Sequence, residues 1–127
     1  MAATGNFILD KGYDASGALA KYKAVKLTGA QLVSPVAAKT DVIIGVAQFG
    51  VAASEIARGK GAAVRVAGAS VMVAGGTCTV GGLAGLMPDG SVHDAVTGDR
   101  VIGIFREGTA TVGGYASVML GLPGNII

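Results

Sequence analysis

Glycine is the residue that most restricts what this chain can fold into, because 22 of its 127 residues are glycine. A glycine inside a helix or strand costs roughly 0.5–1 kcal/mol relative to alanine, and a whole domain is stable by only about 5–15 kcal/mol. Collagen is excluded because glycine does not recur at every third position. We therefore expect most of the glycines in turns, in bulges and at close backbone contacts.

Composition places the chain among folded proteins, since 51% of its residues are hydrophobic and only 14% are charged. Disordered chains show the opposite balance. The length predicts one domain over residues 1–127. A domain of this size buries only about two-thirds of its surface, so we expect part of the apolar surface to lie in contacts with other proteins.

Short apolar runs and period-two alternation predict a chain built from strands. The expected strands cover residues 6–10, 22–27, 42–49, 62–68, 70–74, 101–106 and 115–121. Turn signals such as Pro88-Asp89-Gly90-Ser91 separate them, and only residues 51–58 have helical composition. This pattern predicts a small all-β domain, a β-barrel or β-sandwich of the jelly-roll or β-tulip kind, with at most one short helix.

A weak internal repeat accompanies this pattern. Asp41-Val42-Ile43-Ile44-Gly45-Val46 aligns with Asp99-Arg100-Val101-Ile102-Gly103-Ile104, and each copy then leads through a loop into another strand. The alignment predicts that residues 41–68 and 99–121 are related units within the single domain.

Several classes of partner are disfavoured. Residues 66–87 carry no charge and are long enough to cross a bilayer, but their paired glycines favour turns between short strands, so we expect no membrane span. The net charge of +2 is too small to imply a nucleic-acid partner. Cys78 is the only cysteine and is expected in the core. The first six residues lack the pattern of a signal peptide, so synthesis in a cytoplasm is expected.

The sequence holds no recognisable catalytic motif. His93, the only histidine, is expected to be exposed at a strand end, and Asp89, Asp94 and Asp99 are expected on solvent-facing turns. No nucleophile elbow, phosphate loop or oxygen-rich metal loop is present. We therefore assign no catalytic, cofactor-binding or metal-binding residue and expect that the protein is not an enzyme.

Two groups of residues are candidates for contacts with a partner. Residues 1–14 form either an extended arm, which could add a strand to a partner's sheet, or the first strand of the chain's own sheet. The candidate contact residues of this arm are Asn6, Phe7, Ile8, Leu9 and Tyr13. Residues 1–40 carry five lysines against two aspartates. Within them, Lys21, Lys23 and Lys26 form either a basic contact patch or a solvated strand face.

A family resemblance runs over most of the chain. The strings that carry it are Gly5-Asn6-Phe7-Ile8-Leu9-Asp10, Ala18-Leu19-Ala20-Lys21-Tyr22-Lys23-Ala24-Val25-Lys26-Leu27, Ile44-Gly45-Val46-Ala47, Gly59-Lys60-Gly61-Ala62-Ala63-Val64-Arg65-Val66 and Gly98-Asp99-Arg100-Val101-Ile102-Gly103-Ile104. In this rhythm of glycines and small apolar residues the chain resembles the decoration, or cement, proteins of tailed-bacteriophage capsids. Residues 51–58 are an insertion relative to many members of that family.

The resemblance implies a structural protein of the virion. Such a protein binds the outer surface of the expanded capsid and cements neighbouring subunits of the major capsid protein by non-covalent contacts. It is made in the cytoplasm of the bacterial host, uses no cofactor and commonly forms a homo-oligomer, a trimer or dimer at a symmetry axis. The alternative from the residues themselves is a small β-barrel module that binds a ligand or a host surface, suggested by His93, Asp94 and the inserted loop.

Overall fold

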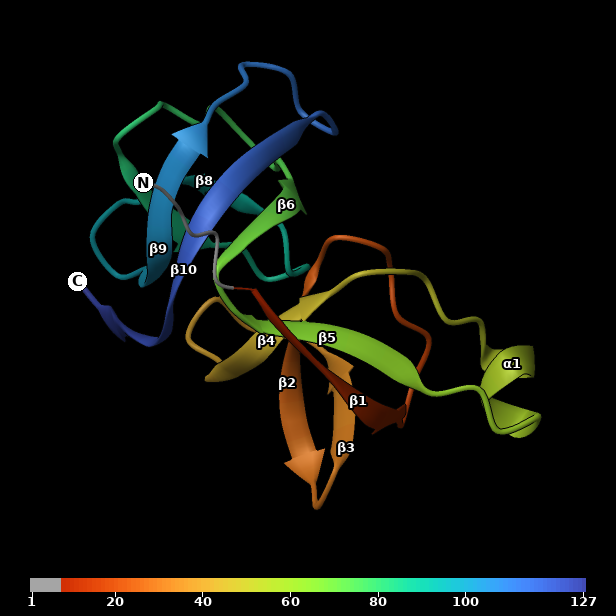
Figure 1. The fold of residues 1–127 in the computed structure, drawn as a ribbon. Coiled ribbons are helices and arrows are strands. Elements are labelled where there is room, and N and C mark those ends of the chain that lie inside the picture. Colours follow the sequence, from red (N-terminus) through yellow and green to blue (C-terminus); the bar gives the residue numbers. More distant parts are fainter. Residues whose placement is uncertain (1–7) are drawn as a thin grey trace, which may run out of the picture.

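The computed structural model describes residues 8–127, which fold into ten strands and one short helix (Figure 1). The prediction of a small all-β domain with a single short helix is confirmed. Three short strands, residues 32–35, 83–86 and 92–94, were not expected from the sequence. Each has only three or four residues, too few for a period-two pattern to emerge.

The first half of the chain forms a closed barrel. Its strands are β1 (Leu9–Ala15), β2 (Ala24–Gly29), β3 (Leu32–Pro35), β4 (Ile43–Ala47) and β5 (Ala62–Ala67), joined in the order β1-β3-β2-β4-β5. Parallel pairing of β1 with β3 and antiparallel pairing of β1 with β5 close the barrel. Its interior is filled by small side chains such as Val25, Val33 and Val64, which suits the narrow lumen of a five-stranded barrel.

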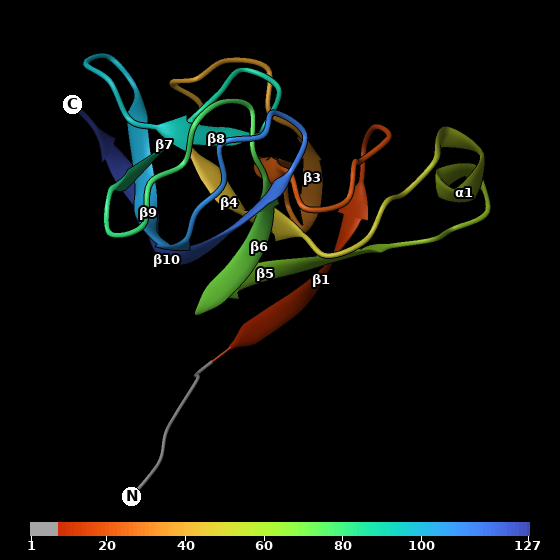
Figure 2. The ribbon, with the colours of Figure 1, turned by 90° about the horizontal axis from the view of Figure 1, so that it is seen from above.

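Helix α1 (Ala53–Ala57) lies in the connection between β4 and β5, on the side of the barrel away from the second half (Figure 2). The Glu55 carboxylate accepts a hydrogen bond from the Ala52 N–H, which holds the first turn of the helix, and pairs with Lys60 at 2.9 Å. The helix therefore lies within residues 51–58, the segment with helical composition.

The second half forms a five-stranded sheet. Its strands are β6 (Ala69–Val73), β7 (Leu83–Leu86), β8 (Val92–Asp94), β9 (Arg100–Glu107) and β10 (Tyr115–Ile126), in the order β6-β10-β9-β7-β8. Larger side chains fill its inner side, among them Phe105, Met72 and Leu86. Cys78 is buried in the same cluster, as expected. The uncharged residues 66–87 contribute the end of β5, the whole of β6 and β7, and the loops between them. None of the described helices is long and apolar enough to span a membrane.

The two halves follow the same path through space. Strands β1 to β5 have the same neighbours and directions as β6 to β10, taken in order. The N–H of Ser16 donates to the carbonyl of Val33, and the N–H of Gly75 donates to that of Val92, both at 2.8 Å. The parallel pairing of β1 with β3 corresponds in the second half to a single parallel bridge between Ala74 and Val92. We call residues at the same place in the two halves equivalent.

The core of the second sheet extends into the first half because β2 and β4 carry apolar side chains on both faces. In β2 and β4, Val25 and Ala47 point into the barrel, whereas Ala24 and Val46 point outward into the cluster of the second sheet. Polar contacts surround this junction: the Ala24 N–H donates to the Gly90 carbonyl, and the Arg100 guanidinium donates to the Thr40 carbonyl.

Comparing the two hairpins leads to a stability prediction. Gln31 in the β2–β3 hairpin has φ +57°, and its equivalent Gly90 in the β7–β8 hairpin has φ +87°. A side chain in the left-handed region costs about 1 kcal/mol, part of which is offset by the extra freedom of glycine in the unfolded chain. Gln31→Gly should therefore raise the free energy of unfolding in urea by about 0.5 kcal/mol. Gln31→Ala keeps the Cβ atom and should bring no gain; an equal gain would contradict the explanation.

Candidate interaction surfaces

Only part of the candidate arm lies within the residues that the structure describes. Asn6 and Phe7 lie outside the described residues. Leu9 and Tyr13 lie in β1, where they pair with Ala67 and Ala62 of β5. Ile8 and Leu9 are 45% and 42% exposed, whereas the Tyr13 side chain packs against the core of the barrel. The exposed apolar part of the arm within residues 8–14 is therefore its beginning.

The lysines of the candidate basic patch are largely matched by local charges or rings. The ammonium group of Lys23 lies 3.5 Å from the Asp89 carboxylate, and that of Lys26 lies 3.3 Å from Asp41. Lys21 lies over the Tyr22 ring, 4.8 Å from its centroid. These neighbours weaken the field that the three lysines can project toward an acidic partner.

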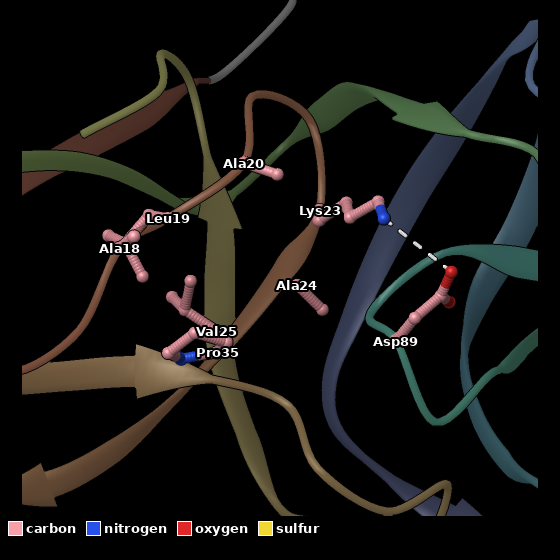
Figure 3. A pocket seen from close by; sticks show the side chains of 8 residues that line it. All are labelled: Ala18, Leu19, Ala20, Lys23, Ala24, Val25, Pro35 and Asp89. Atoms are coloured by element: carbon pink, nitrogen blue, oxygen red, sulfur yellow. Dashed lines mark hydrogen bonds and ion pairs between the residues drawn. The ribbon is translucent and has the colours of Figure 1, made fainter. Parts of the chain in front are cut away.

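A small pocket opens beside the Lys23–Asp89 ion pair (Figure 3). It is lined by Ala18, Leu19, Ala20, Lys23, Ala24, Val25, Pro35 and Asp89. Its volume is about 190 Å³, below the roughly 300–1,000 Å³ of pockets that bind small molecules. The pocket is large enough for one side chain of a partner.

His93 and Asp99 form a polar cluster that the sequence did not reveal. The His93 Nε2 donates to Asp99 Oδ2 at 2.7 Å, the Val96 N–H donates to the same oxygen at 3.0 Å, and the Lys39 ammonium lies 3.6 Å from Oδ1. The expected solvent-facing position of Asp99 is wrong, because its side chain is 2% exposed. His93 lies within β8 and is mostly covered.

The contacts of Asp99 explain why its carboxylate is stable in the interior. Burial alone raises the pKa of the carboxyl, but the hydrogen bonds from Val96 and His93 and the charges nearby outweigh burial and hold the pKa below its ordinary value of 3.8. Asp41, the equivalent residue, has Lys26 as its partner. Both aspartates accept a hydrogen bond from the N–H three residues earlier and so stabilise the turn that precedes β4 or β9.

An apolar surface covers the outer side of the second sheet. We call it the open face and define it by Leu83, Ile104, Met119, Val71 and Tyr115. Strand pairing places Leu83 beside Ile104 and Ile104 beside Met119, so these three form a row across β7, β9 and β10. The five side chains are 37% to 61% exposed. Adjoining exposed apolar side chains, such as the three of this row, mark an interaction site more often than scattered exposed residues do.

A groove continues the open face toward the end of β10. It is lined by Leu83, Val101, Gly103, Ile104, Gly121, Gly124, Asn125 and Ile127, and its volume is about 350 Å³. The groove exists because β10 departs from regular pairing with β9 between Leu120 and Asn125. In the sequence, the open face is indicated by consecutive apolar residues in β10. Met119 lies on the open face, and its neighbours Val118 and Leu120 are buried and half-buried, so the strand is apolar on both sides.

Comparison with known proteins shows the fold. No protein-family model matches the sequence, and no curated protein matches it. Among solved structures, the chain is similar to the head fiber gp8.5 N base of bacteriophage phi29, with a TM-score of 0.68 and 17% sequence identity. The match covers 95% of this chain and 99% of that one. The likeness therefore extends over both halves.

Proposed function

We propose that the protein is a structural component of a phage virion that binds the outer surface of the expanded capsid and cements neighbouring subunits of the major capsid protein. The observation that carries the proposal is the fold shared with a phage head fiber base along 95% of the chain. The role requires non-covalent contacts only: no catalysis, cofactor, nucleic acid or membrane. The protein is made in the host cytoplasm and ends on the virion surface.

The start of β1 is the proposed site of shell contact. Strand β3 pairs only with Asp14 and Ala15 of β1, so within residues 8–127 one edge of residues 9–12 carries no neighbouring strand. Ile8 and Leu9 present exposed apolar side chains beside that edge. An edge of this kind can add to an exposed sheet of the shell through backbone hydrogen bonds.

Binding of this kind stabilises the shell by linkage. A standard interface buries about 800 Å² of each partner, so a small protein can contact two subunits across a seam. A ligand that binds only the expanded shell stabilises that state, and many copies on one lattice multiply the effect.

The proposal predicts that adding the protein to expanded, undecorated capsids raises their disruption temperature. The protein should also sediment with the capsids at micromolar concentration. Leu9→Asp should weaken this association at least tenfold because it places a charge at the apolar start of β1. Val112→Asp, at an exposed position in the β9–β10 connection, is the matched control and should bind as the unaltered protein does. No sedimentation of the unaltered protein would contradict the proposed function.

A further inference from the structure

Tyr22 has a backbone conformation that large side chains rarely adopt. Its φ angle is +63°, in the left-handed region, and its equivalent in the second half is Gly81, with φ +79°. The N–H of Tyr22 donates to the carbonyl of Ala47 at 2.8 Å. The N–H of Gly81 makes the matching hydrogen bond, to the carbonyl of Phe105, also at 2.8 Å. The same turn is therefore built once with glycine and once with a strained tyrosine.

The ring of Tyr22 packs against a second tyrosine that also stands in a glycine's place. It meets the Tyr115 ring edge-to-face, with 5.6 Å between the centroids. Strand pairing makes Gly61 the equivalent of Tyr115. Both rings thus stand at positions where the other half of the chain folds with glycine.

Stability does not account for this pair of rings. An aromatic pair contributes about as much free energy as the left-handed conformation costs a residue with a side chain, so the strain at Tyr22 offsets the contact. Tyr115 is 61% exposed, so the pair fills no core. Strained residues of this kind are concentrated at functional sites.

Two further side chains complete an exposed surface around the rings. Val73 pairs with Tyr115 in the sheet, and its N–H donates to the Tyr22 carbonyl at 3.0 Å. The Lys21 ammonium lies over the Tyr22 ring, 4.8 Å from its centroid. We call Lys21, Tyr22, Val73 and Tyr115 the tyrosine platform. Tyrosine is among the residues that contribute most to binding at protein interfaces.

Lys21 gives the platform a positive charge. Lys23 and Lys26 each form an ion pair with an aspartate, whereas no carboxylate among residues 8–127 lies within ion-pair distance of Lys21. The Tyr22 ring attracts the ammonium group but does not neutralise it. The platform therefore complements a carboxylate that has an apolar side chain beside it.

We propose that the tyrosine platform binds an acidic segment of the major capsid protein, with a carboxylate on Lys21 and an apolar side chain against the two rings. This inference rests on the proposed function and adds a second contact to it. The start of β1 pairs with Ala67, and Tyr115 pairs with Val73. The end of β5 and β6 join those two residues by roughly 20 Å of extended chain. A protein that cements two subunits needs a contact with each, and two separate sites meet that need.

The test measures sedimentation of the full chain with expanded capsids over a range of protein concentrations. Tyr115→Ala and Lys21→Glu should each weaken binding at least tenfold. Phe49→Ala and Arg58→Glu are the matched controls and should bind as the unaltered protein does. Phe49 is also an exposed ring beneath a lysine, with the Lys60 ammonium 5.0 Å from its centroid, and Arg58 is an exposed cation at the end of α1.

Tyr22→Gly separates a role in binding from a role in folding. Glycine relieves the strained backbone and stands at the equivalent place in the second half, so the midpoint of unfolding in urea should stay nearly unchanged. Capsid binding should nevertheless fall at least tenfold, because the ring that supports Tyr115 is gone. A large loss of stability with normal binding would make the pair a folding contact and overturn the proposal.

Salt tests the charged contact. Binding of the unaltered protein should weaken as sodium chloride is raised from about 50 to about 500 mM, since salt screens exposed charges. Binding of Lys21→Gln should depend less on salt. An equal salt dependence of the two proteins would overturn the acidic nature of the partner.

The remaining outcomes separate this inference from the proposed function. Unaltered protein that sediments with capsids while the platform variants bind equally well would overturn the inference and leave the proposed function in place. Unaltered protein that does not sediment would contradict the proposed function itself. Self-association of the full chain without capsids that Tyr115→Ala abolishes would assign the platform to a second copy, and would also overturn the inference.

Discussion

Gly103→Ala should lower the free energy of unfolding by about 3 kcal/mol, and Gly45→Ala by a similar amount. The two glycines are equivalent and lie in β9 and β4. A Cβ atom at Gly103 would collide with the Met119 carbonyl and the Val118 side chain, and one at Gly45 would collide with the Arg65 carbonyl and the Val64 side chain. A backbone carbonyl in a paired strand cannot move aside without breaking the sheet.

The control uses glycines with free space around them. A Cβ atom at Gly12 or Gly121 would meet nothing within 4 Å. Gly12→Ala and Gly121→Ala should therefore be neutral or stabilise by up to about 0.5 kcal/mol, since alanine loses less entropy on folding. Urea unfolding of the four variants provides the measurement. Equal effects at all four positions would show that close approach is not what requires glycine in β4 and β9.

Asp99→Ala should also lower the free energy of unfolding by about 3 kcal/mol. Removing this buried carboxylate leaves the Val96 N–H and the His93 Nε2 without their acceptor and takes the partner from Lys39. Asp89→Ala is the matched control, because Asp89 also pairs with a lysine but its side chain is 60% exposed. That change should cost less than about 1 kcal/mol, as exposed ion pairs usually do. Similar losses in both variants would contradict the role of burial.

The same carboxylate gives the protein an acid-sensitive stability. The pKa of Asp99 is lower in the folded protein than its ordinary value of 3.8, so the unfolded chain binds more protons at acid pH. The stability that Asp99 contributes is fully present above that ordinary value and is lost as pH falls through the lower folded pKa. Unfolding free energies measured between pH 6 and pH 2.5 should fall less steeply for Asp99→Asn; an unchanged slope would assign the acid sensitivity to other groups.

Sequence patterns of six or more residues predicted the positions of several elements correctly. The helical composition of residues 51–58 located α1, and the aligned strings around Gly45 and Gly103 lie in and just before β4 and β9. Elsewhere equivalent residues share little chemistry: Ser34 stands where the other half has His93, and Lys26 stands where it has Gly85. That residues 41–68 and 99–121 are related units stays a prediction.

The candidate surfaces could be predicted only in part. The surplus of apolar residues indicated that some of them would be exposed, but not that Leu83, Ile104 and Met119 would form one row. Their alignment depends on two strand pairings, of Leu83 with Ile104 and of Ile104 with Met119, that join residues far apart in the sequence. The burial of Asp99 was missed for the same reason, since Lys39 approaches it from the other half of the chain.

By itself, the sequence determined the class of fold: so many glycines and so few charges allow short strands and tight turns, and little else. The tertiary structure alone decided which glycines are indispensable, which tyrosine rings lie together, and where charge can be buried. The physical reason is that these properties depend on atoms brought together across the two halves, and no local pattern records those distances.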